Sequence, residues 1–469
     1  MQYSELDDYE VLAGSLTVWR PRTEWNDACL DDRPLAPQHE RYVSVHPPDQ
    51  NGDWIGTVFE IHLPYNQEAM REALWRWHQR HEAFRTTARE GGSTWQRLVA
   101  RPAAVEVVPE VDGSFSTGDE ANERLQELFG ESIHPHQWPH LIVTTIVPPT
   151  VASEHSHFQV AFAADHSVMD AYSQVLAVTE LNQLYAETLA GVQREESPKV
   201  ASYIDFSAYE CGLATASGFD DTLTRWQQFL GVDQPEFPPF PLYAGGSAEG
   251  PARRQRSVNR EFLPIDLTNL VHRAAKTRGH GMQTAVLCAL AEATRRTTGS
   301  GDLEFVMPMH TRTPDYLQSM GWFVGLSPVT IPLDLNAREL LDPIGALLER
   351  CATATAHVRD DAAVPYPVVE DQLGVRSTPR FVISFVDIRF VPGEDQFDVV
   401  RARALRSPAT SDDEFYLWVV RAGSGMNISA RFPDNPVATA SFEMFMATVR
   451  EVLIEVGSAA ASNEEELAA

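Results

Sequence analysis

The residues best suited to chemistry in this sequence are His166 and Asp170, within the stretch FAADHSVMDAY at 162–172. An apolar run at 158–164 predicts a buried strand, and a helical pattern begins after Asp170. His166 would therefore lie where a strand ends, a position that holds a side chain rigidly and leaves its polar atoms accessible. A histidine suits acid-base chemistry at neutral pH, because its unperturbed pKa is about 6.5.

The same residues also have a purely structural interpretation. His166 would be a loop histidine at a strand-helix junction, and Asp170 an ordinary acid in the first turn of a helix, favoured by the helix dipole. The HxxxD spacing alone does not decide between these interpretations, because two common polar residues recur at a fixed spacing by accident. The elements that surround the motif have to decide.

Length and composition predict a globular protein of two lobes. With 469 residues the chain exceeds the size that a single core reaches, about 250–300 residues, and its 43% hydrophobic and 22% charged residues are ordinary. The formal charge of −29 disfavours nucleic acid and anionic membranes as partners. No apolar stretch is long enough to span a membrane and no signal peptide is evident, so we expect a cytoplasmic protein.

The cysteines and histidines indicate neither disulfides nor metal. The four cysteines are scattered without a CxxC pair. Three histidines at 134, 136 and 140 have a spacing that could gather imidazoles, but prolines interrupt it and no carboxylate completes a ligand set. We expect no metal site.

Both halves of the chain alternate between strand and helix patterns, which predicts a mixed α/β fold. A strand at 54–63 precedes a helix capped by Asn66, whose end, RHEAFRTT at 80–87, is best interpreted as a solvated basic end. The Pro- and Gly-rich stretch 231–256 predicts a linker between an N-terminal lobe, 1–230, and a C-terminal lobe, 257–456. We expect the acidic tail, 457–469, to be disordered.

The linker also contains the densest basic cluster of this acidic chain, Arg253, Arg254 and Arg256. Such a cluster is usually a solvated loop. It is also a candidate phosphate contact.

Five segments in order resemble one known family: RHEAFRT at 80–86, HSVMD at 166–170, MHTR at 309–312, GWFVGLSPVTIPL at 321–333 and RFPDNP at 431–436. The chain resembles the CoA-dependent acyltransferase superfamily, which includes the condensation domains of nonribosomal peptide synthesis. It is more similar to the polyketide-associated acyltransferases, which esterify lipids and trehalose-type glycolipids. The resemblance extends from about residue 50 to 456.

This resemblance implies two lobes like chloramphenicol acetyltransferase, arranged in a V around a central channel with His166 at its middle. It implies no bound cofactor, and a donor substrate that is acyl-CoA or an acyl group on the phosphopantetheine of a carrier protein. The acceptor would be a hydroxyl of a lipid, glycolipid or polyketide. A carrier protein or polyketide synthase would be a partner, and the family suggests a monomer.

The resemblance also implies roles for individual residues. His166 would be the general base, and Asp170 would turn away from the substrate to form an ion pair with Arg312 that holds the site. Gly321, Trp322, Phe323 and Gly325 match a Gly-aromatic segment of the channel, although core packing is an equal alternative for the two aromatic residues. Ser384 is a candidate oxyanion donor, or else a strand serine bonded to backbone.

Two departures from the condensation-domain pattern favour the ester-forming branch. Asp165 stands where condensation domains usually have a second histidine, and Ala171 where they have glycine. The first change occurs in the ester-forming branch. Two other functions stay open at this point: a free-standing condensation enzyme that forms an amide, and a catalytically silent member that binds a carrier protein.

Overall fold

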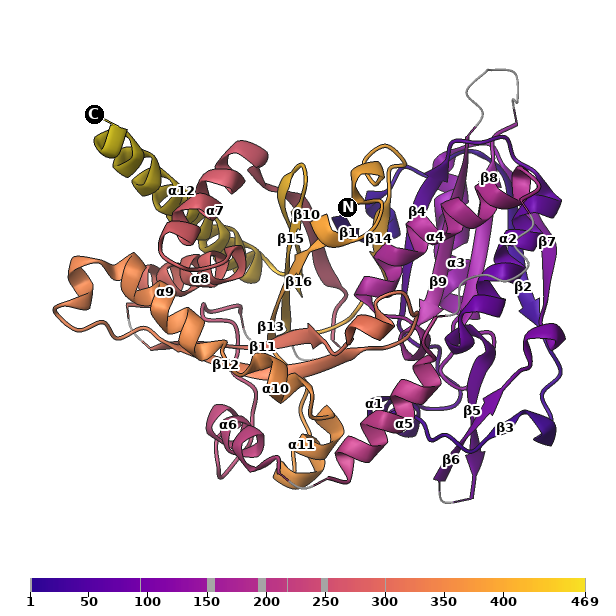
Figure 1. Ribbon diagram of the computed structural model, residues 1–469, viewed down its shortest axis with the longest axis horizontal. Coiled ribbons are helices and arrows are strands. Elements are labelled where there is room, and N and C mark those ends of the chain that lie inside the picture. The colour runs from indigo at the N-terminus through magenta and orange to yellow at the C-terminus, as the bar shows by residue number, and fades with distance from the viewer. Residues whose placement is uncertain are drawn as a thin grey trace. The chain divides into compact units, whose positions relative to one another are not determined.

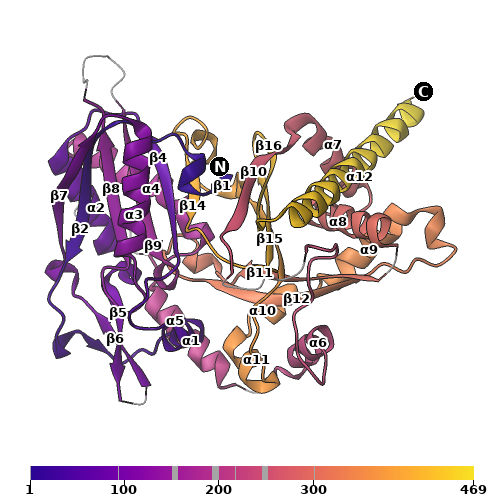
Figure 2. The ribbon, with the colours of Figure 1, turned by 180° about the vertical axis from the view of Figure 1, so that it is seen from behind.

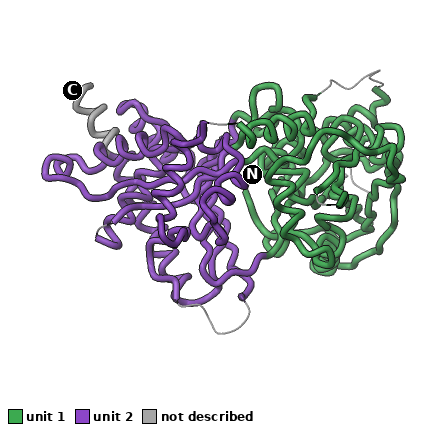
Figure 3. The backbone as a smooth tube through the Cα atoms, turned by 90° about the horizontal axis from the view of Figure 1, so that it is seen from below, with its two compact units in different colours: residues 1–217, 310–324, 390–408 green, residues 218–309, 325–389, 409–469 purple. Residues whose placement is uncertain are grey.

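The computed structural model describes residues 2–92, 94–149, 157–192, 200–216, 218–245, 252–299 and 301–468, with side chains as far as residue 458 (Figures 1 and 2). These residues form two compact units (Figure 3). Unit 1 comprises 1–217, 310–324 and 390–408, and unit 2 comprises 218–309, 325–389 and 409–469. Each unit has a sheet with helices packed on it, which confirms the predicted mixed α/β class.

Among the described residues, the main sheet of unit 1 has seven strands. Their order across the sheet is β1 (Gln2–Ser4), β14 (Arg403–Arg406), β4 (Trp54–Ile61), β9 (Phe158–Asp165), β8 (Leu141–Val147), β2 (Gly14–Arg22) and β7 (Glu106–Phe115). All neighbours are antiparallel except β1 and β14, which are parallel. β9, which leads to His166, therefore lies between two long strands in the middle of the sheet.

Helices cover both faces of this sheet. α3 (Gly118–Ser132) packs Leu125 and Phe129 against one face, in a cluster that includes Val58 of β4. α4 (Ala171–Leu189) lies on the other face, where the Thr57 hydroxyl donates to its backbone, and α2 (Gln67–Arg80) packs beside α4. Unit 1 also includes α1 (Pro37–Val45), α5 (Tyr203–Ala214) and a smaller sheet of β3 (Leu30–Asp31), β6 (Thr94–Val99) and β5 (Thr86–Gly91).

Unit 2 is built on a sheet in the order β10 (Gln255–Pro264), β16 (Gly425–Pro433), β15 (Phe415–Ala422), β13 (Phe381–Asp387), β11 (Asp302–His310) and β12 (Val324–Pro332). Alternate residues of its strands face two different cores. Phe381 and Ile383 join the cluster of α7 (Ile265–Thr277), α8 (Met282–Thr298), α9 (Pro343–Ala354) and α12 (Pro436–Ala468). Val382, between them, joins the cluster of α6 (Asp220–Leu230) and α11 (Tyr366–Leu373), the latter preceded by α10 (Val358–Ala362).

The division of the chain differs from a single linker at 231–256. Unit 1 ends near residue 217, α6 belongs to unit 2, and β10 begins inside the expected linker. Two later segments, 310–324 and 390–408, return to unit 1, because β14 pairs with β1 and β4. Such long-range pairing leaves no signal in local composition. Residues 246–251 of the expected linker lie outside the described residues.

The acidic tail, 457–469, falls at the end of α12, which runs from Pro436 to Ala468, and its side chains from residue 459 onward are outside the described residues. Within the described chain, no helix is both long and apolar enough to cross a bilayer.

Candidate active site

Two aspartates fix the backbone on either side of His166. β9 is buried along its whole length and ends at Asp165, whose carboxylate accepts the Ser167 amide at 2.9 Å and so caps a single 3-10 turn, His166–Val168. Asp170 is the N-cap of α4 and accepts the Ser173 amide at 2.7 Å. The strand and helix predicted on the two sides of the motif are both confirmed, so His166 lies in a tight turn at a strand end.

Asp165 is itself held from a second element. Its other carboxylate oxygen accepts the hydroxyl of Tyr42, on α1, at 2.9 Å, and its side chain is fully buried. In the sequence, Asp165 is a marker of the ester-forming branch, whereas Tyr42 lies in a proline-rich segment without clear periodicity and was not predicted to contact it. Together the two residues fix the start of the turn that carries His166.

The imidazole of His166 packs at a tilt against the indole of Trp322. The ring centroids are 4.6 Å apart at an interplanar angle of 38°. Trp322 in turn meets the ring of Tyr42 edge to face, with centroids 5.8 Å apart. His166 is half-buried, its Nδ1 is buried, and among the described residues neither ring nitrogen has a hydrogen-bond partner. Within the part of the chain that the structure describes, the ring is therefore positioned by packing and not by hydrogen bonds.

Asp170 does not face His166 but binds Arg312, and the ion pair expected between them is present. Nη2 of Arg312 lies 2.8 Å from Oδ1 and 2.9 Å from Oδ2 of Asp170, and both side chains are buried. Burial raises the pKa of Asp170, but Arg312 and the hydrogen bonds from Ser173 outweigh that effect and hold the pKa below its ordinary value. Asp170 is therefore a buried anion.

Arg312 stabilises the fold of the segment 310–324 through hydrogen bonds and connects this segment to α4. Its Nη1 donates to the carbonyl oxygens of Tyr316 and Ser319, at 2.9 and 2.5 Å, and its Nη2 donates to the Ser173 hydroxyl at 2.8 Å. The guanidinium also lies over the ring of Phe323, 4.0 Å from its centroid. One cation thus joins the helix start to the segment that supplies Trp322.

The two aromatic residues of the Gly-aromatic segment have different surroundings. Phe323 is fully buried against Tyr203 and Phe206, and its amide donates to Asp170 Oδ2 at 3.0 Å, so core packing is the correct interpretation for this residue. Trp322, one residue earlier, is half-buried and contacts His166.

The two glycines of this segment are required by close packing. A Cβ at Gly321, where φ is +155°, would lie 2.4 Å from Cδ2 of Tyr203. A Cβ at Gly325, in unit 2, would lie 1.8 Å from the backbone oxygen of Ala362. Gly321 lets the segment pass α5 next to Trp322, and Gly325 lets β12 approach α10.

Ser384 lies on β13 of unit 2, half-buried, with Trp418 of β15 as its partner in the parallel pair. Its role as an oxyanion donor stays a prediction.

The end of α2 differs from its interpretation as a solvated basic end. Arg80 and His81 bind Glu180 of α4, at 2.5 and 2.7 Å, and their side chains are 12% and 1% exposed. Arg85 is buried and donates to the carbonyl oxygens of His78 and Ala100. The interpretation was wrong because the acid that neutralises this cluster lies about 100 residues further along the chain.

The remaining candidates are placed as follows. His140 contacts the Thr87 hydroxyl and the His134 carbonyl oxygen, and His136 contacts the His46 carbonyl oxygen. Within the described ranges there is no group of three or more His, Cys, Asp or Glu side chains arranged to hold a metal ion. Arg253, Arg254 and Arg256 are exposed at the start of β10, and their contact with phosphate stays a prediction.

Comparison with known proteins identifies the family of the chain. Residues 42–467 match the model of the condensation domain. The chain therefore belongs to the condensation-domain family. Acyltransferase PapA3 of Mycobacterium tuberculosis is 24% identical to it over 96% of each chain. Trehalose-2-sulfate acyltransferase PapA2 of the same organism is 22% identical over 76% of this chain and 74% of its own.

A solved structure of the PapA2 acyl transferase superposes on the chain with a TM-score of 0.83, at 21% identity, covering 97% of this chain and all of that one. The fold is therefore that of the condensation-domain acyltransferases. With this family and these relatives, the chain is an acyltransferase.

Proposed function

We propose that this acyltransferase moves an acyl group from the thioester of CoA or of a carrier protein to a hydroxyl group of a lipid, glycolipid or polyketide acceptor, with His166 as general base. The observation that carries the proposal is the state of the His166 imidazole. It is half-buried at a strand end, packed at a tilt against Trp322, and without a hydrogen-bond partner on either ring nitrogen among the described residues. The nearest motif acid, Asp170, is bound to Arg312.

The chemistry needs one base that later acts as an acid. A neutral alcohol is a poor nucleophile, so His166 removes the hydroxyl proton as the oxygen attacks the thioester carbonyl carbon. The C–S bond then breaks as the tetrahedral intermediate collapses, and the imidazolium gives its proton to the leaving thiolate. The products are an ester and a free thiol, and His166 returns to its neutral form.

Asp170 has a supporting role in this scheme and is no third member of a catalytic triad. A triad carboxylate orients its histidine through a hydrogen bond to a ring nitrogen. Both oxygens of Asp170 are already occupied by Arg312 and by the amides of Ser173 and Phe323. The ring of His166 is oriented instead by Trp322. Ser384 remains the candidate donor to the oxyanion of the intermediate.

The choice of a hydroxyl acceptor is supported by the named relatives. Trehalose-2-sulfate acyltransferase PapA2 has, by its name, a sugar acceptor, and the acylation of a trehalose sugar forms an ester. Asp165, in place of a second histidine, is hydrogen-bonded to Tyr42 and Ser167 and so supports the turn without taking part in proton transfer.

The test is product identification. The purified chain is incubated with acyl-CoA of several chain lengths, or with the same acyl groups on a carrier protein, and with trehalose, sulfated trehalose, long-chain alcohols and amines. We expect an ester, identified by its mass, and its formation about 10²–10⁴-fold slower with His166→Ala. Amide formation without ester formation would contradict the acceptor class, and transfer by His166→Ala within a few-fold of the wild-type rate would contradict the mechanism.

A further inference from the structure

A second acid on α4 connects to the segment that supplies Trp322. Glu180 lies ten residues after Asp170, about three helical turns further along α4. Its Oε2 accepts the Trp77 indole N–H at 3.1 Å and faces Nε2 of His81 at 2.7 Å, while its Oε1 pairs with Nε of Arg80 at 2.5 Å. Burial raises the pKa of Glu180, but His81 and Arg80 outweigh it and hold that pKa below its ordinary value.

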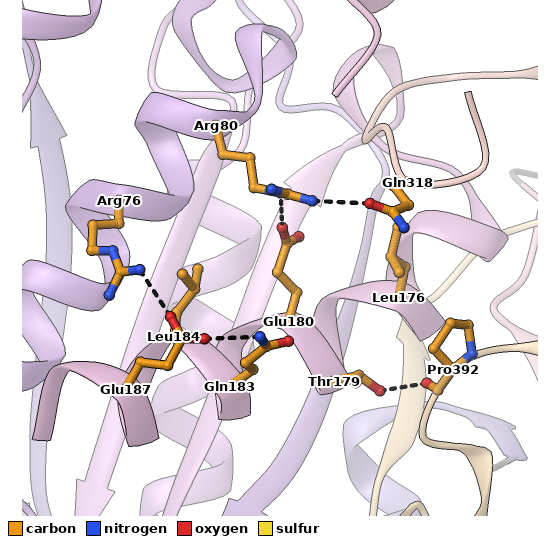
Figure 4. Close-up of a pocket in the computed structure, with 10 residues that line it drawn as sticks. All are labelled: Arg76, Arg80, Leu176, Thr179, Glu180, Gln183, Leu184, Glu187, Gln318 and Pro392. Carbon is orange, nitrogen blue, oxygen red and sulfur yellow. Dashed lines mark hydrogen bonds and ion pairs between the residues drawn. The ribbon is translucent and has the colours of Figure 1, made fainter. Parts of the chain in front are cut away.

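Both of these basic residues also reach the segment 310–324. The amide of Met320 donates to Nδ1 of His81 at 3.4 Å, and Nη2 of Arg80 donates to the Gln318 side-chain oxygen at 3.2 Å. Figure 4 shows Arg80 between Glu180 and Gln318 in the pocket that α2 and α4 line. Glu180 is therefore connected to residues 318 and 320 through the side chains of Arg80 and His81, both of which it contacts directly.

The geometry also defines the proton on His81. An amide N–H can donate to Nδ1 only if Nδ1 carries no proton, so Nε2 carries it and donates to Glu180. Without the Glu180 carboxylate, no acceptor at position 180 would favour the tautomer of His81 that carries its proton on Nε2. In the other tautomer Nδ1 carries the proton and cannot accept the Met320 amide. The bond between Met320 and His81 thus depends on the acid behind it.

The two anchored residues are close to the site. Met320 is two residues before Trp322. The carbonyl oxygen of Ser319, between Gln318 and Met320, accepts a hydrogen bond from Nη1 of Arg312. The segment is therefore attached to α4 at two points, Asp170 at the helix start and Glu180 further along. The first attachment fixes Phe323, and the second fixes the residues that lead into Trp322.

We propose that Glu180 is a positioning residue for the acyl transfer, which through His81 and Arg80 holds residues 318–320 so that Trp322 keeps the His166 ring in its reactive orientation. This inference rests on the proposed function of His166. Glu180 touches no reacting atom in this scheme, and its effect on the reaction passes through Trp322.

The chain supplies a matched control in the same pocket. Arg76 and Glu187 form a second ion pair between α2 and α4, at 3.0 Å, with side chains 12% and 13% exposed, against 12% and 12% for Arg80 and Glu180. Arg76 bonds to Glu187 and Thr188, both on α4. Glu187→Gln and Arg76→Gln therefore remove a comparable pair that holds the same helices without passing through His81.

The first experiment measures hydrogen-deuterium exchange of the peptide covering 314–324, which needs no substrate. We expect faster exchange in Glu180→Gln than in wild type, and wild-type exchange in Glu187→Gln. Equal exchange in the two variants overturns the proposal. If Glu180→Gln does not fold, Arg80→Gln, compared with Arg76→Gln, makes the same test, because it removes the contact with Gln318 together with the ion pair to Glu180 and keeps the Glu180 carboxylate next to His81.

The second experiment measures kcat and KM for ester formation in a double-mutant cycle with Trp322→Ala. We expect Glu180→Gln to lower kcat about tenfold with little change in KM, as for a misplaced catalytic group, and to have almost no further effect once Trp322 is removed. Additive losses, or a full rate in Glu180→Gln, overturn the proposal. If wild type forms no ester but the exchange result is as expected, the proposed function is wrong and the anchoring by Glu180 stands.

Discussion

The carboxylate of Asp170 lies 2.8 and 2.9 Å from Nη2 of Arg312, and the two side chains are 1% and 0% exposed. This pair separates the two polar residues of the HxxxD motif into different tasks. Asp170 connects the start of α4 to the segment 310–324, and neither ring nitrogen of His166 has a hydrogen-bond partner in the described part of the chain. We expect loss of either residue to lower activity, but for different physical reasons.

The first prediction therefore concerns stability. Removing one partner of a buried ion pair leaves an uncompensated charge, so we expect Asp170→Ala to lower the free energy of unfolding by about 3–5 kcal/mol. His166→Ala removes a half-buried ring without hydrogen bonds and should cost less than about 1.5 kcal/mol. Urea denaturation of both variants measures the difference. Equal losses would show that Asp170 is not the structural member of the motif.

The second prediction concerns pH. Asp170 and Glu180 have pKa values below their ordinary range in the folded chain, so both stabilise folding above their unfolded values, near pH 4, and this stabilisation is lost as the pH falls through the folded values. Glu180→Gln removes one of these groups. We expect the gap in unfolding free energy between wild type and Glu180→Gln to narrow as the pH falls below about 4. A gap that stays constant in urea titrations between pH 7 and pH 3.5 would contradict the pKa direction.

The third prediction concerns Gly321. Because an added Cβ would lie 2.4 Å from the Tyr203 ring, Gly321→Ala should shift the segment next to Trp322, with a cost of about 1–3 kcal/mol and a lower kcat. Gly212→Ala is the control, since its Cβ would meet nothing within 4 Å on the exposed side of α5, and it should be neutral or stabilising. Thermal unfolding and the rate of ester formation check both. A Gly321→Ala variant with the unfolding midpoint and rate of wild type would contradict the prediction that close packing against Tyr203 requires glycine at this position.

The fourth prediction concerns the packing of the Trp322 indole against the His166 imidazole. Trp322→Phe keeps an aromatic ring over the imidazole and should retain most of the activity, whereas Trp322→Ala frees the imidazole and should lower kcat about tenfold. Because Trp322 is half-buried, both variants should fold like wild type. Steady-state kinetics with unfolding midpoints makes the comparison. Equal rates in the two variants would show that packing against an aromatic ring at position 322 does not position His166.

The sequence predicts the part of this site that depends on the hydrophobic patterns of neighbouring residues. The strand before His166 and the helix after Asp170 carry their own hydrophobic patterns, and both are confirmed within one or two residues. The pairing of Asp170 with Arg312 came from resemblance to a family, because no local pattern connects residues 142 positions apart. Tyr42 had no such support and was not predicted.

The parts that could not be predicted depend on long-range contacts. β2, in the main sheet of unit 1, forms by pairing with β7 and β8, which lie far along the chain from it. The end of α2 was interpreted as solvated, because its basic residues are visible in the sequence and their buried partner Glu180 is not adjacent to them. β14 likewise joins the sheet of unit 1 by pairing with β1 and β4, which are distant in sequence.

The most direct test of the account is the rate of ester formation by His166→Ala under saturating thioester donor and alcohol acceptor, with the unfolding midpoint measured on the same sample. General-base catalysis typically contributes about 10²–10⁴-fold, so we predict a loss of that size in a variant that folds like wild type. A folded His166→Ala variant whose rate stays within a few-fold of wild type would contradict the account.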